Sequence, residues 1–124
     1  MMQSDPIQPD ADYRRHLAAG RFMLQRSRSS GGFVFYPRVA ERGSGATDLE
    51  WVEASGLGSV YSATIVRQRP PALDYNVALI DLAEGPRMMS RVVGSAPGEV
   101  RIGMPVRARI VVENDAALVV FDPA

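Results

Sequence analysis

The sequence predicts a mostly β protein with one short helix near its N-terminus. From Leu49 onward, apolar and polar residues alternate with a period of two, which is typical of half-buried strands. Near the N-terminus, Tyr13 and Leu17 lie one helical turn apart and would form the apolar stripe of a small helix. A chain of 124 residues with 46% hydrophobic residues is long enough to bury a core as one unit.

The predicted helix begins at Asp10 and ends at Ala19. Asp10 suits the N-cap because its side chain can accept a hydrogen bond from a free backbone amide. Gly20 suits the next position because glycine adopts the left-handed conformation with little strain. Residues 1–9 are polar and contain prolines, so we expect a loosely held tail.

The second half of the chain predicts a series of strands interrupted by one short helical segment. The expected strands cover residues 61–65, 75–83, 87–93, 104–112 and 117–121, and the helical turn covers 96–101. Proline fixes its own backbone angle, so Glu84-Gly85-Pro86 predicts a tight hairpin. This order of strands and helix is that of the five-stranded Greek-key barrel called the OB-fold.

The alternation also predicts which side chains face the barrel interior. We expect Tyr61, Ala63 and Ile65 to share the buried face of their strand, and the even-numbered residues from Met104 to Val112 to do so in theirs. Gly56 and Gly58 suit a corner where a barrel strand bends.

The charge and composition of the chain exclude several classes of protein. The formal net charge is zero, with 14 basic and 14 acidic residues, so a general affinity for nucleic acids or anionic lipids is not expected. With no cysteine there is no disulfide framework and no thiolate nucleophile or metal ligand. No apolar run approaches the ~20 residues of a membrane span, and residues 1–10 lack a secretion signal, which predicts a cytoplasmic protein.

Three segments carry a resemblance to a known family. They are Leu49 to Ser62 (LEWVEASGLGSVYS), Glu84 to Ser90 (EGPRMMS) and Arg101 to Val106 (RIGMPV). Together they resemble the DUF35 family of OB-fold proteins, which accompany thiolases and other acyl-CoA enzymes. The resemblance covers about residues 13–122. It implies a tail and helix at 1–20, a degenerate zinc-ribbon-like segment at 21–47 and an OB-fold barrel at 48–124.

The same resemblance implies that a zinc site has been lost. Members of the family hold one zinc ion with two Cys-x-x-Cys pairs, and the matching positions here are Ser27, Ser30, Ala40 and Gly43. Serine stays protonated near neutral pH, and alanine and glycine offer no side-chain donor, so no zinc and no other cofactor is predicted. We expect the metal-free ribbon to be held by aromatic packing and by a partner protein. The packing residues would be Phe22, Phe33, Phe35 and Tyr36.

Two groups of residues are candidates for contact with a partner or with coenzyme A. In the ribbon, the aromatic residues Phe33, Phe35 and Tyr36 are surrounded in sequence by Arg26, Arg28, Arg38 and Arg42. This composition suits a protein interface or the phosphates of coenzyme A, or the aromatic residues close the hairpin on the barrel. In the second group, Glu84, Arg87 and Met88 form either a hairpin corner or a contact surface. Met88 and Met89 would point to opposite faces.

Other candidate sites follow from residue type alone. His16, the single histidine, is predicted to be solvated. A catalytic carboxylate pair would need two of Asp74, Asp81 and Glu84 to approach one another. Single-stranded nucleic acid would need exposed aromatic rings beside basic groups. The candidates are Trp51, Tyr61 and Tyr75 with Arg67, Arg69, Arg107 and Arg109.

The predicted function is that of a non-catalytic accessory subunit. The resemblance implies a thiolase-like (aldolase or acyltransferase) or MaoC-type hydratase partner whose substrate channel this chain supports, with the helix and ribbon as the docking element. No catalytic residue is assigned to the chain itself, which would be part of an acyl-CoA-processing complex. The alternatives are a stand-alone acyl-CoA-binding protein and a nucleic-acid-binding OB module, and the isolated chain could form a homodimer through an open strand edge.

Overall fold

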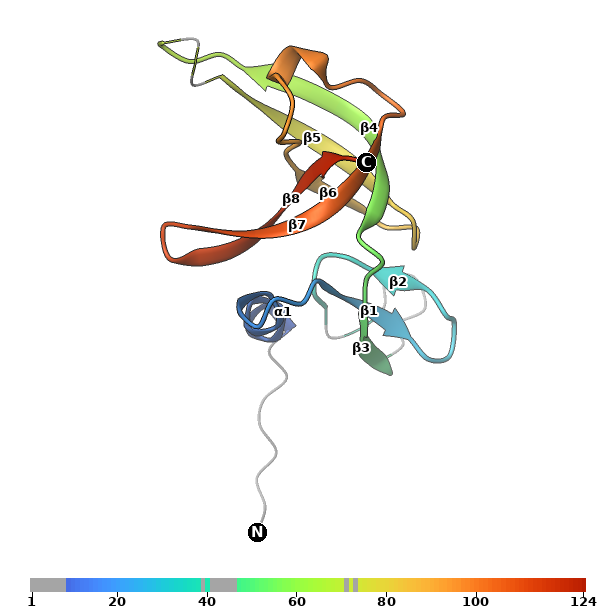
Figure 1. The fold of residues 1–124 in the computed structure, drawn as a ribbon. Helices are drawn as coiled ribbons and strands as arrows, with labels where there is room; N and C mark the ends of the chain where they lie inside the picture. The colour runs from blue at the N-terminus through green and yellow to red at the C-terminus, as the bar shows by residue number, and fades with distance from the viewer. Residues whose placement is uncertain (1–8, 39, 41–46, 71, 73) are drawn as a thin grey trace.

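The computed structural model describes residues 9–38, 40, 47–70, 72 and 74–124. The chain forms a helix, a small three-stranded sheet and a curled five-stranded sheet (Figure 1). The small sheet has the order β2-β1-β3 and the large one the order β6-β5-β4-β7-β8. The elements are α1 (Pro9–Ala18), β1 (Met23–Ser27), β2 (Phe33–Val34), β3 (Leu49–Glu53), β4 (Leu57–Val66), β5 (Tyr75–Leu82), β6 (Arg87–Ser90), the 3-10 helix η2 (Pro97–Glu99), β7 (Pro105–Glu113) and β8 (Ala116–Pro123).

Helix α1 ends at the predicted glycine. Gly20 has a φ of +82°, its amide donates to the carbonyl of Leu17 (2.9 Å), and the amide of Arg21 donates to the carbonyl of His16 (2.9 Å). These two bonds form a Schellman motif, which satisfies carbonyls that the helix end leaves free. The sequence prediction of the helix and its end is therefore confirmed to within one residue.

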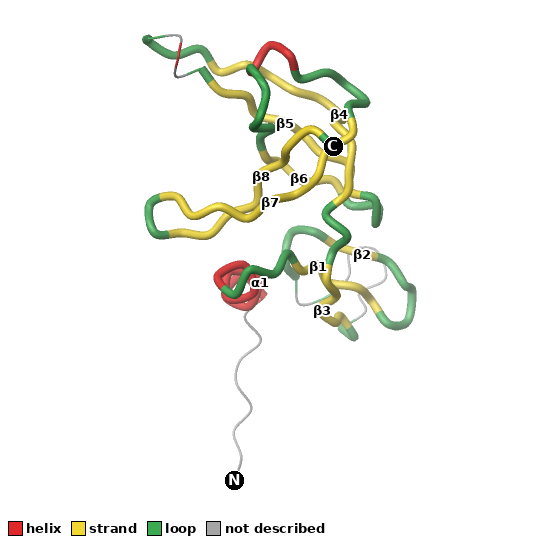
Figure 2. The backbone as a smooth tube through the Cα atoms, viewed as in Figure 1, coloured by secondary structure: helices red, strands yellow, loops and turns green. Residues whose placement is uncertain are grey.

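The small sheet includes residues 49–53, which lie in the segment that the resemblance assigned to the barrel. β3 pairs antiparallel with the whole of β1, from Met23 opposite Glu53 to Ser27 opposite Leu49. The two sheets are joined by residues 54–56, which run as a loop into β4 (Figure 2). The five-stranded sheet therefore starts at Leu57, and residues 49–53 pair with the ribbon segment.

The large sheet has the OB-fold order that the sequence predicts. β4 pairs with β5 along its length but with β7 only from Leu57 to Ser59, so the sheet curls away from β4. β7 and β8 form a hairpin whose turn residues, Asn114 and Asp115, both have positive φ, as a two-residue type I′ turn requires. The expected helical turn is the short η2, which lies at the opposite end of the barrel from α1 (Figure 2).

Between β6 and β8 the barrel is closed by only a few contacts. Val92, just after β6, forms an isolated parallel bridge with Phe121, and the Val93 amide donates to the Phe121 carbonyl (2.7 Å). The side chain of Asn76 reinforces this point by exchanging two hydrogen bonds with the backbone of Val92 (2.7 and 2.8 Å). At the end of β6, the Ser90 hydroxyl donates to the Val119 carbonyl (2.9 Å) and so holds the seam between β6 and β8.

The core joins the helix and ribbon to the barrel. Burying this set of apolar side chains is the main driving force for the fold. It consists of Leu17, Phe22, Leu24, Val60, Ala78, Ile80, Leu82, Met88, Val92, Val106, Val119 and Phe121. No helix in the described part of the chain is long and apolar enough to span a membrane.

The predicted burial of Tyr61 is wrong, because a β-bulge reverses the alternation. The register between β4 and β5 shifts between Val60 and Ser62, so Val60 points into the core whereas Tyr61 is 47% exposed. In β7, Val106 is buried and Ala108 and Ile110 pack against the core, as expected. Val112 is exposed, because this end of the β7–β8 hairpin extends beyond the part paired with β4.

Candidate functional site

The turn after β1 keeps a compact shape without cysteines. The buried Ser27 hydroxyl donates to Asp48 Oδ1 (2.9 Å) and accepts a hydrogen bond from the Ser30 amide (3.3 Å). The amide of Ser29 donates to Asp48 Oδ2 (2.8 Å). These bonds tie the turn to the residue that precedes β3. The hydrogen bond from Ser27 lowers the pKa of Asp48 below its usual range.

The residues at the family's zinc positions do not fit a zinc ion. The Ser27 oxygen is already engaged by Asp48 and Ser30, and Ala40 has no side-chain donor. Gly43 lies outside the described residues, as does Arg42. In the part of the chain that the structure describes, no three His, Asp or Glu side chains gather as a group that could hold a metal ion.

The aromatic residues of the ribbon pack against helix α1. Tyr13 contacts Phe35 edge to face, with ring centroids 5.8 Å apart, and stacks on Trp51 at 6.4 Å. Phe35 in turn contacts Tyr36 at 4.9 Å. Burial raises the pKa of Tyr13 to about 12, so its hydroxyl stays protonated at neutral pH. Phe33 and Phe35 thus help to close the hairpin, whereas Tyr36 is 56% exposed and free to contact a partner.

The predicted arginine rim around these rings is partly occupied. Arg26 lies over the ring of Phe33, with its guanidinium carbon 5.6 Å from the ring centre. Arg28 forms an ion pair with Glu50 (3.0 Å). The backbone of Arg38 exchanges two hydrogen bonds with the side chain of the buried Gln25 (2.6 and 2.7 Å), which fixes the chain next to Tyr36.

Glu84 and Arg87, the predicted contact residues at the turn of the β5–β6 hairpin, have different partners in the structure. Glu84 accepts a hydrogen bond from the Ser55 amide (2.7 Å), so it anchors the loop between the two sheets. Arg87 pairs with Asp81 (2.7 Å) and its guanidinium carbon lies 3.4 Å from the centre of the Tyr61 ring. The hydrogen bond to Asp81 raises the pKa of Arg87.

The two methionines of β6 face opposite sides, as predicted. Met88 is 3% exposed and belongs to the core, whereas Met89 is 59% exposed. Of the two, only Met89 is exposed enough to contact a partner, whereas Met88, the one that the sequence analysis selected, is buried.

The candidate catalytic groups are not brought together. Asp74 and Asp81 lie at opposite ends of β5, where Asp74 pairs with Arg67 and Asp81 with Arg87. Glu84 is held at the hairpin by Ser55. His16 packs against Trp51, with ring centroids 5.1 Å apart. None of these contacts forms a proton-transfer pair.

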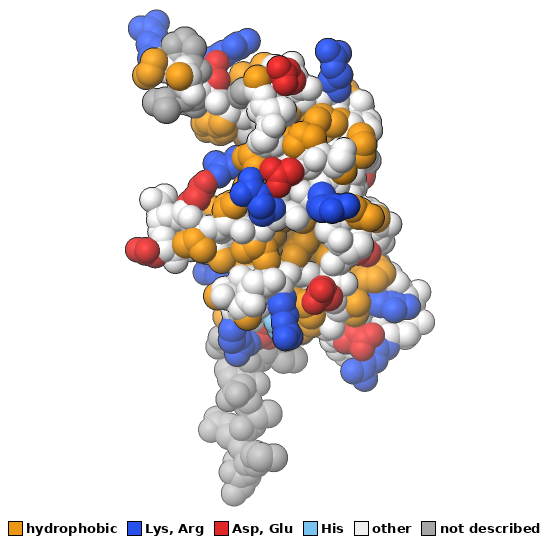
Figure 3. Space-filling view, in the orientation of Figure 1, with side chains coloured by type: hydrophobic (Ala, Val, Ile, Leu, Met, Phe, Trp, Pro, Cys, Tyr) orange, Lys and Arg blue, Asp and Glu red, His pale blue; other side chains and the backbone are white. Residues whose placement is uncertain are grey.

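Several of the candidate nucleic-acid residues are engaged with other side chains. Arg67 pairs with Asp74 (3.2 Å) and Arg109 with Asp122 (2.8 Å). Trp51 is packed under α1. On the face shown in Figure 3, basic and acidic side chains lie side by side and do not gather into a basic stripe. This face therefore has no basic groove of the kind that single-stranded nucleic acids require.

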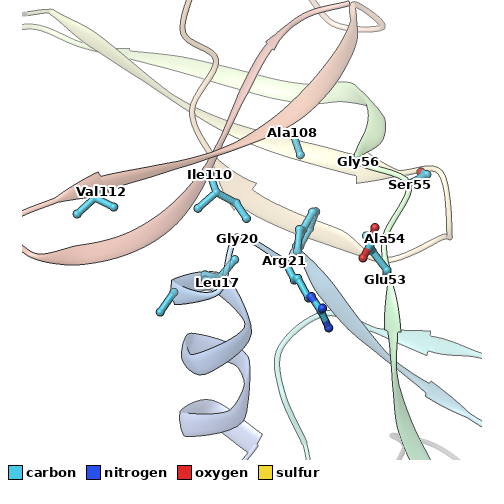
Figure 4. Close-up of a pocket in the computed structure, with 12 residues that line it drawn as sticks. Leu17, Gly20, Arg21, Glu53, Ala54, Ser55, Gly56, Ala108, Ile110 and Val112 are labelled. Atoms are coloured by element: carbon cyan, nitrogen blue, oxygen red, sulfur yellow. The ribbon is translucent and has the colours of Figure 1, made fainter.

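A groove of about 540 Å³ lies where α1, the loop between the sheets and β7 meet (Figure 4). Ala108, Ile110 and Val112 line one side, and Leu17 lines another. Arg21 and Glu53 add one charge of each sign. We call it the Arg21 groove. Sequence reasoning missed it because it forms only where segments far apart in the chain meet.

Two further grooves lie along the seam between β6 and β8. The helix groove, of about 350 Å³, lies between α1, residues 35–37 and the two strands. The seam groove, of about 330 Å³, lies beside Tyr75 and Val77 of β5. Met89, Leu118 and Val119 line both. The two grooves therefore form one continuous surface that reaches from Tyr36 to Tyr75.

This fold and these surfaces define the chain as an OB-fold protein with an N-terminal ribbon-like sheet, and comparisons with known proteins agree. A family model described as "ChsH2, C-terminal OB-fold domain" matches residues 51–111. A DUF35 domain-containing scaffold protein of Methanocaldococcus jannaschii is 30% identical over 99 residues, which cover 73% of this chain and 70% of the relative. The chain therefore belongs to the DUF35 family.

Two other similar proteins have names that describe subunits of an acyl-CoA hydratase or of an aldolase. A probable enoyl-CoA hydratase alpha subunit of Thermomonospora curvata is 42% identical over 84 residues, which cover 64% of this chain. The chain spans only 26% of that relative's length. A chain of the solved structure described as the Ltp2-ChsH2(DUF35) aldolase has a TM-score of 0.83 and 31% identity, with 98% of each chain covered.

Proposed function

We propose that this chain is a non-catalytic accessory subunit that binds an enzyme acting on acyl-CoA substrates and supports its substrate channel. The observation that carries the proposal is the match, over 98% of both chains, to a chain of the Ltp2-ChsH2(DUF35) aldolase. The name of the Thermomonospora relative, an enoyl-CoA hydratase alpha subunit, supports the same class of partner. The partner is a thiolase-like or MaoC-type hydratase subunit, and the assembly works in the cytoplasm.

Co-purification from the native organism tests the proposal. The tagged chain should recover one thiolase-like or hydratase subunit at a fixed ratio, identified by mass spectrometry. Adding the chain to that recombinant subunit should raise its turnover of an acyl-CoA substrate, and the chain alone should give none. Recovery of neither class of enzyme, or turnover by the isolated chain, would contradict the proposal.

The Arg21 groove favours a second candidate, direct binding of an acyl-CoA by this chain. Its volume of about 540 Å³ lies in the ordinary range of ligand sites, ~300–1,000 Å³. Arg21 offers a cation to a phosphate, while Ile110 and Val112 offer apolar contact to an acyl chain. A ligand that binds the native state raises the unfolding temperature. If acyl-CoA esters raise it in the wild type but not in an Arg21→Ala variant, without any enzyme present, this second function gains support.

A further inference from the structure

The continuous surface formed by the helix groove and the seam groove brings together parts of the two sites that the sequence predicted separately. Tyr36 comes from the aromatic ribbon segment and Met89 from the hairpin, and both line the helix groove. Met89 also lines the seam groove, with Tyr75 at its other end. Tyr36, Met89 and Tyr75 are 56%, 59% and 42% exposed, so three large apolar side chains lie on this one surface.

The charged side chains are confined to the two ends of this surface. Asp10 and Arg14, of opposite sign, lie at the helix end. Arg91 and Glu113 lie at the seam end and form an ion pair with each other. The middle, around Met89 and Leu118, is lined by apolar residues. A charge-depleted centre with a polar rim is the composition of a protein–protein interface.

This charge pattern argues against a phosphate-bearing ligand. The phosphates of coenzyme A or of a nucleic acid need cations that are free to bind them. Arg91 is already paired with Glu113, and the one other cation among the described residues of this surface, Arg14, shares the helix groove with the opposite charge of Asp10. The exposed side chains are also those that carry binding energy at protein interfaces, since aromatic residues anchor and methionine adapts its shape to a partner.

Strand β5 gives independent support for a covered outer face. Its inward residues Asn76, Ala78, Ile80 and Leu82 are buried. Of its outward residues, Tyr75, Val77 and Leu79 are mainly apolar, and only Asp81, at the far end of the strand, is charged and is paired with Arg87. The outer face is therefore apolar over residues 75–79. An antiparallel strand with one solvated face normally alternates apolar with polar residues, and a strand apolar on both faces is typical of one that is covered on both. Leu79 lies directly opposite Met89 in the pairing of β5 with β6.

We propose that the surface from Tyr36 through Met89 to Tyr75 is where the acyl-CoA enzyme subunit docks. The inference rests on the proposed function, because the occupant is the catalytic partner named there. A neutral apolar surface fits an equally neutral apolar patch of a folded protein. The match to a chain of an aldolase complex over 98% of both chains makes such an enzyme subunit the occupant, in preference to a second copy of this chain.

The test measures binding of the recombinant enzyme subunit identified by co-purification to the full chain and to two variants. Met89→Asp places a charge at the centre of the surface, and because Met89 is exposed it should leave the fold intact. The control is Ile102→Asp, at an apolar residue that is 77% exposed and lies outside both grooves. Thermal unfolding of each variant checks the fold. Tyr75→Ala is a second variant on the same surface.

We expect Met89→Asp to weaken binding at least ~30-fold, as for a residue at the centre of an interface, and Tyr75→Ala to weaken it as well. Ile102→Asp should stay within about twofold of the wild type. Equal binding by wild type and Met89→Asp would overturn the docking surface and leave the proposed function standing. Failure of the wild type to bind any such enzyme would overturn both. Analytical ultracentrifugation covers the remaining case, since a wild-type dimer that Met89→Asp dissociates would assign the surface to a second copy.

Discussion

Replacing Ser27 with alanine tests whether hydrogen bonds hold the ribbon turn in place of a metal ion. The Ser27 hydroxyl is fully buried, donates to Asp48 Oδ1 at 2.9 Å and accepts from the Ser30 amide at 3.3 Å. A hydrogen bond contributes about 0.5–1.5 kcal/mol net to stability. Asp48 lies at the surface, where water can replace the serine, so we expect Ser27→Ala to cost about 1 kcal/mol.

Amide hydrogen exchange is the appropriate assay because the effect is local. A loss of about 1 kcal/mol increases the open population of the turn roughly fivefold. Amides of β1 and β3 should therefore exchange about five times faster in Ser27→Ala, while those of β7 and β8 should not change. Thr64→Ala, at an exposed position of β4, is the matched control. Unchanged exchange in β1 and β3 would refute the idea that this hydroxyl supports the turn.

Three further predictions concern other parts of the fold. The pKa of Asp48 is lower in the folded state, so its stabilising effect is complete above pH 4 and is lost as the pH falls through the folded pKa. Protection of ribbon amides should therefore fall at low pH in the wild type but not in Asp48→Asn. The pKa of Tyr13 is raised from 10.0 to about 12, so its stabilising effect is complete below pH 10 and is lost as the pH rises towards 12. A step near pH 12 in the absorbance of tyrosinate should be missing in Tyr13→Phe. A Cβ at Gly58 would lie 2.7 Å from the Asp81 carbonyl oxygen and 2.9 Å from Ile80 Cγ2. Gly58→Ala should therefore cost about 1–3 kcal/mol by overpacking, measured by denaturant unfolding. Gly98→Ala is the control, because Gly98 has no positive φ and a Cβ there would meet only Ile65 Cδ1, at 3.9 Å.

The features that the sequence predicts best depend on neighbours along the chain. The end of α1 at Gly20 needs only a residue that adopts positive φ after a helix. The hairpin at Glu84-Gly85-Pro86 likewise depends on local turn chemistry, which also fixes where β5 ends and β6 begins. These predictions are confirmed because local sequence is sufficient to decide them.

The features that were missed depend on which segments meet in space. Tyr61 follows the apolar alternation, but the bulge between Val60 and Ser62 turns it outward, and a bulge is defined by the register with β5. Residues 49–53 fall in the segment that the resemblance assigned to the barrel, yet as strand β3 they pair with β1. The choice between Met88 and Met89 likewise needed the register of β6 on β5, which places Met88 opposite the buried Ile80.

The ribbon turn and the proposed docking surface are connected through strand β1, so the hydrogen bonds that hold the turn should also affect binding. Tyr36 lies just before the point where Gln25 of β1 holds the backbone of Arg38. Gln25 is two residues from Ser27 on the same short strand, which β3 and the bonds to Asp48 hold in place. Loosening this turn should therefore release Tyr36 from its position. A partner that binds Tyr36 must then order it again, which lowers the affinity of the complex. Binding of the partner should in turn protect the ribbon amides, and this protection should be larger in Ser27→Ala than in the wild type, because more of its ribbon is open before binding.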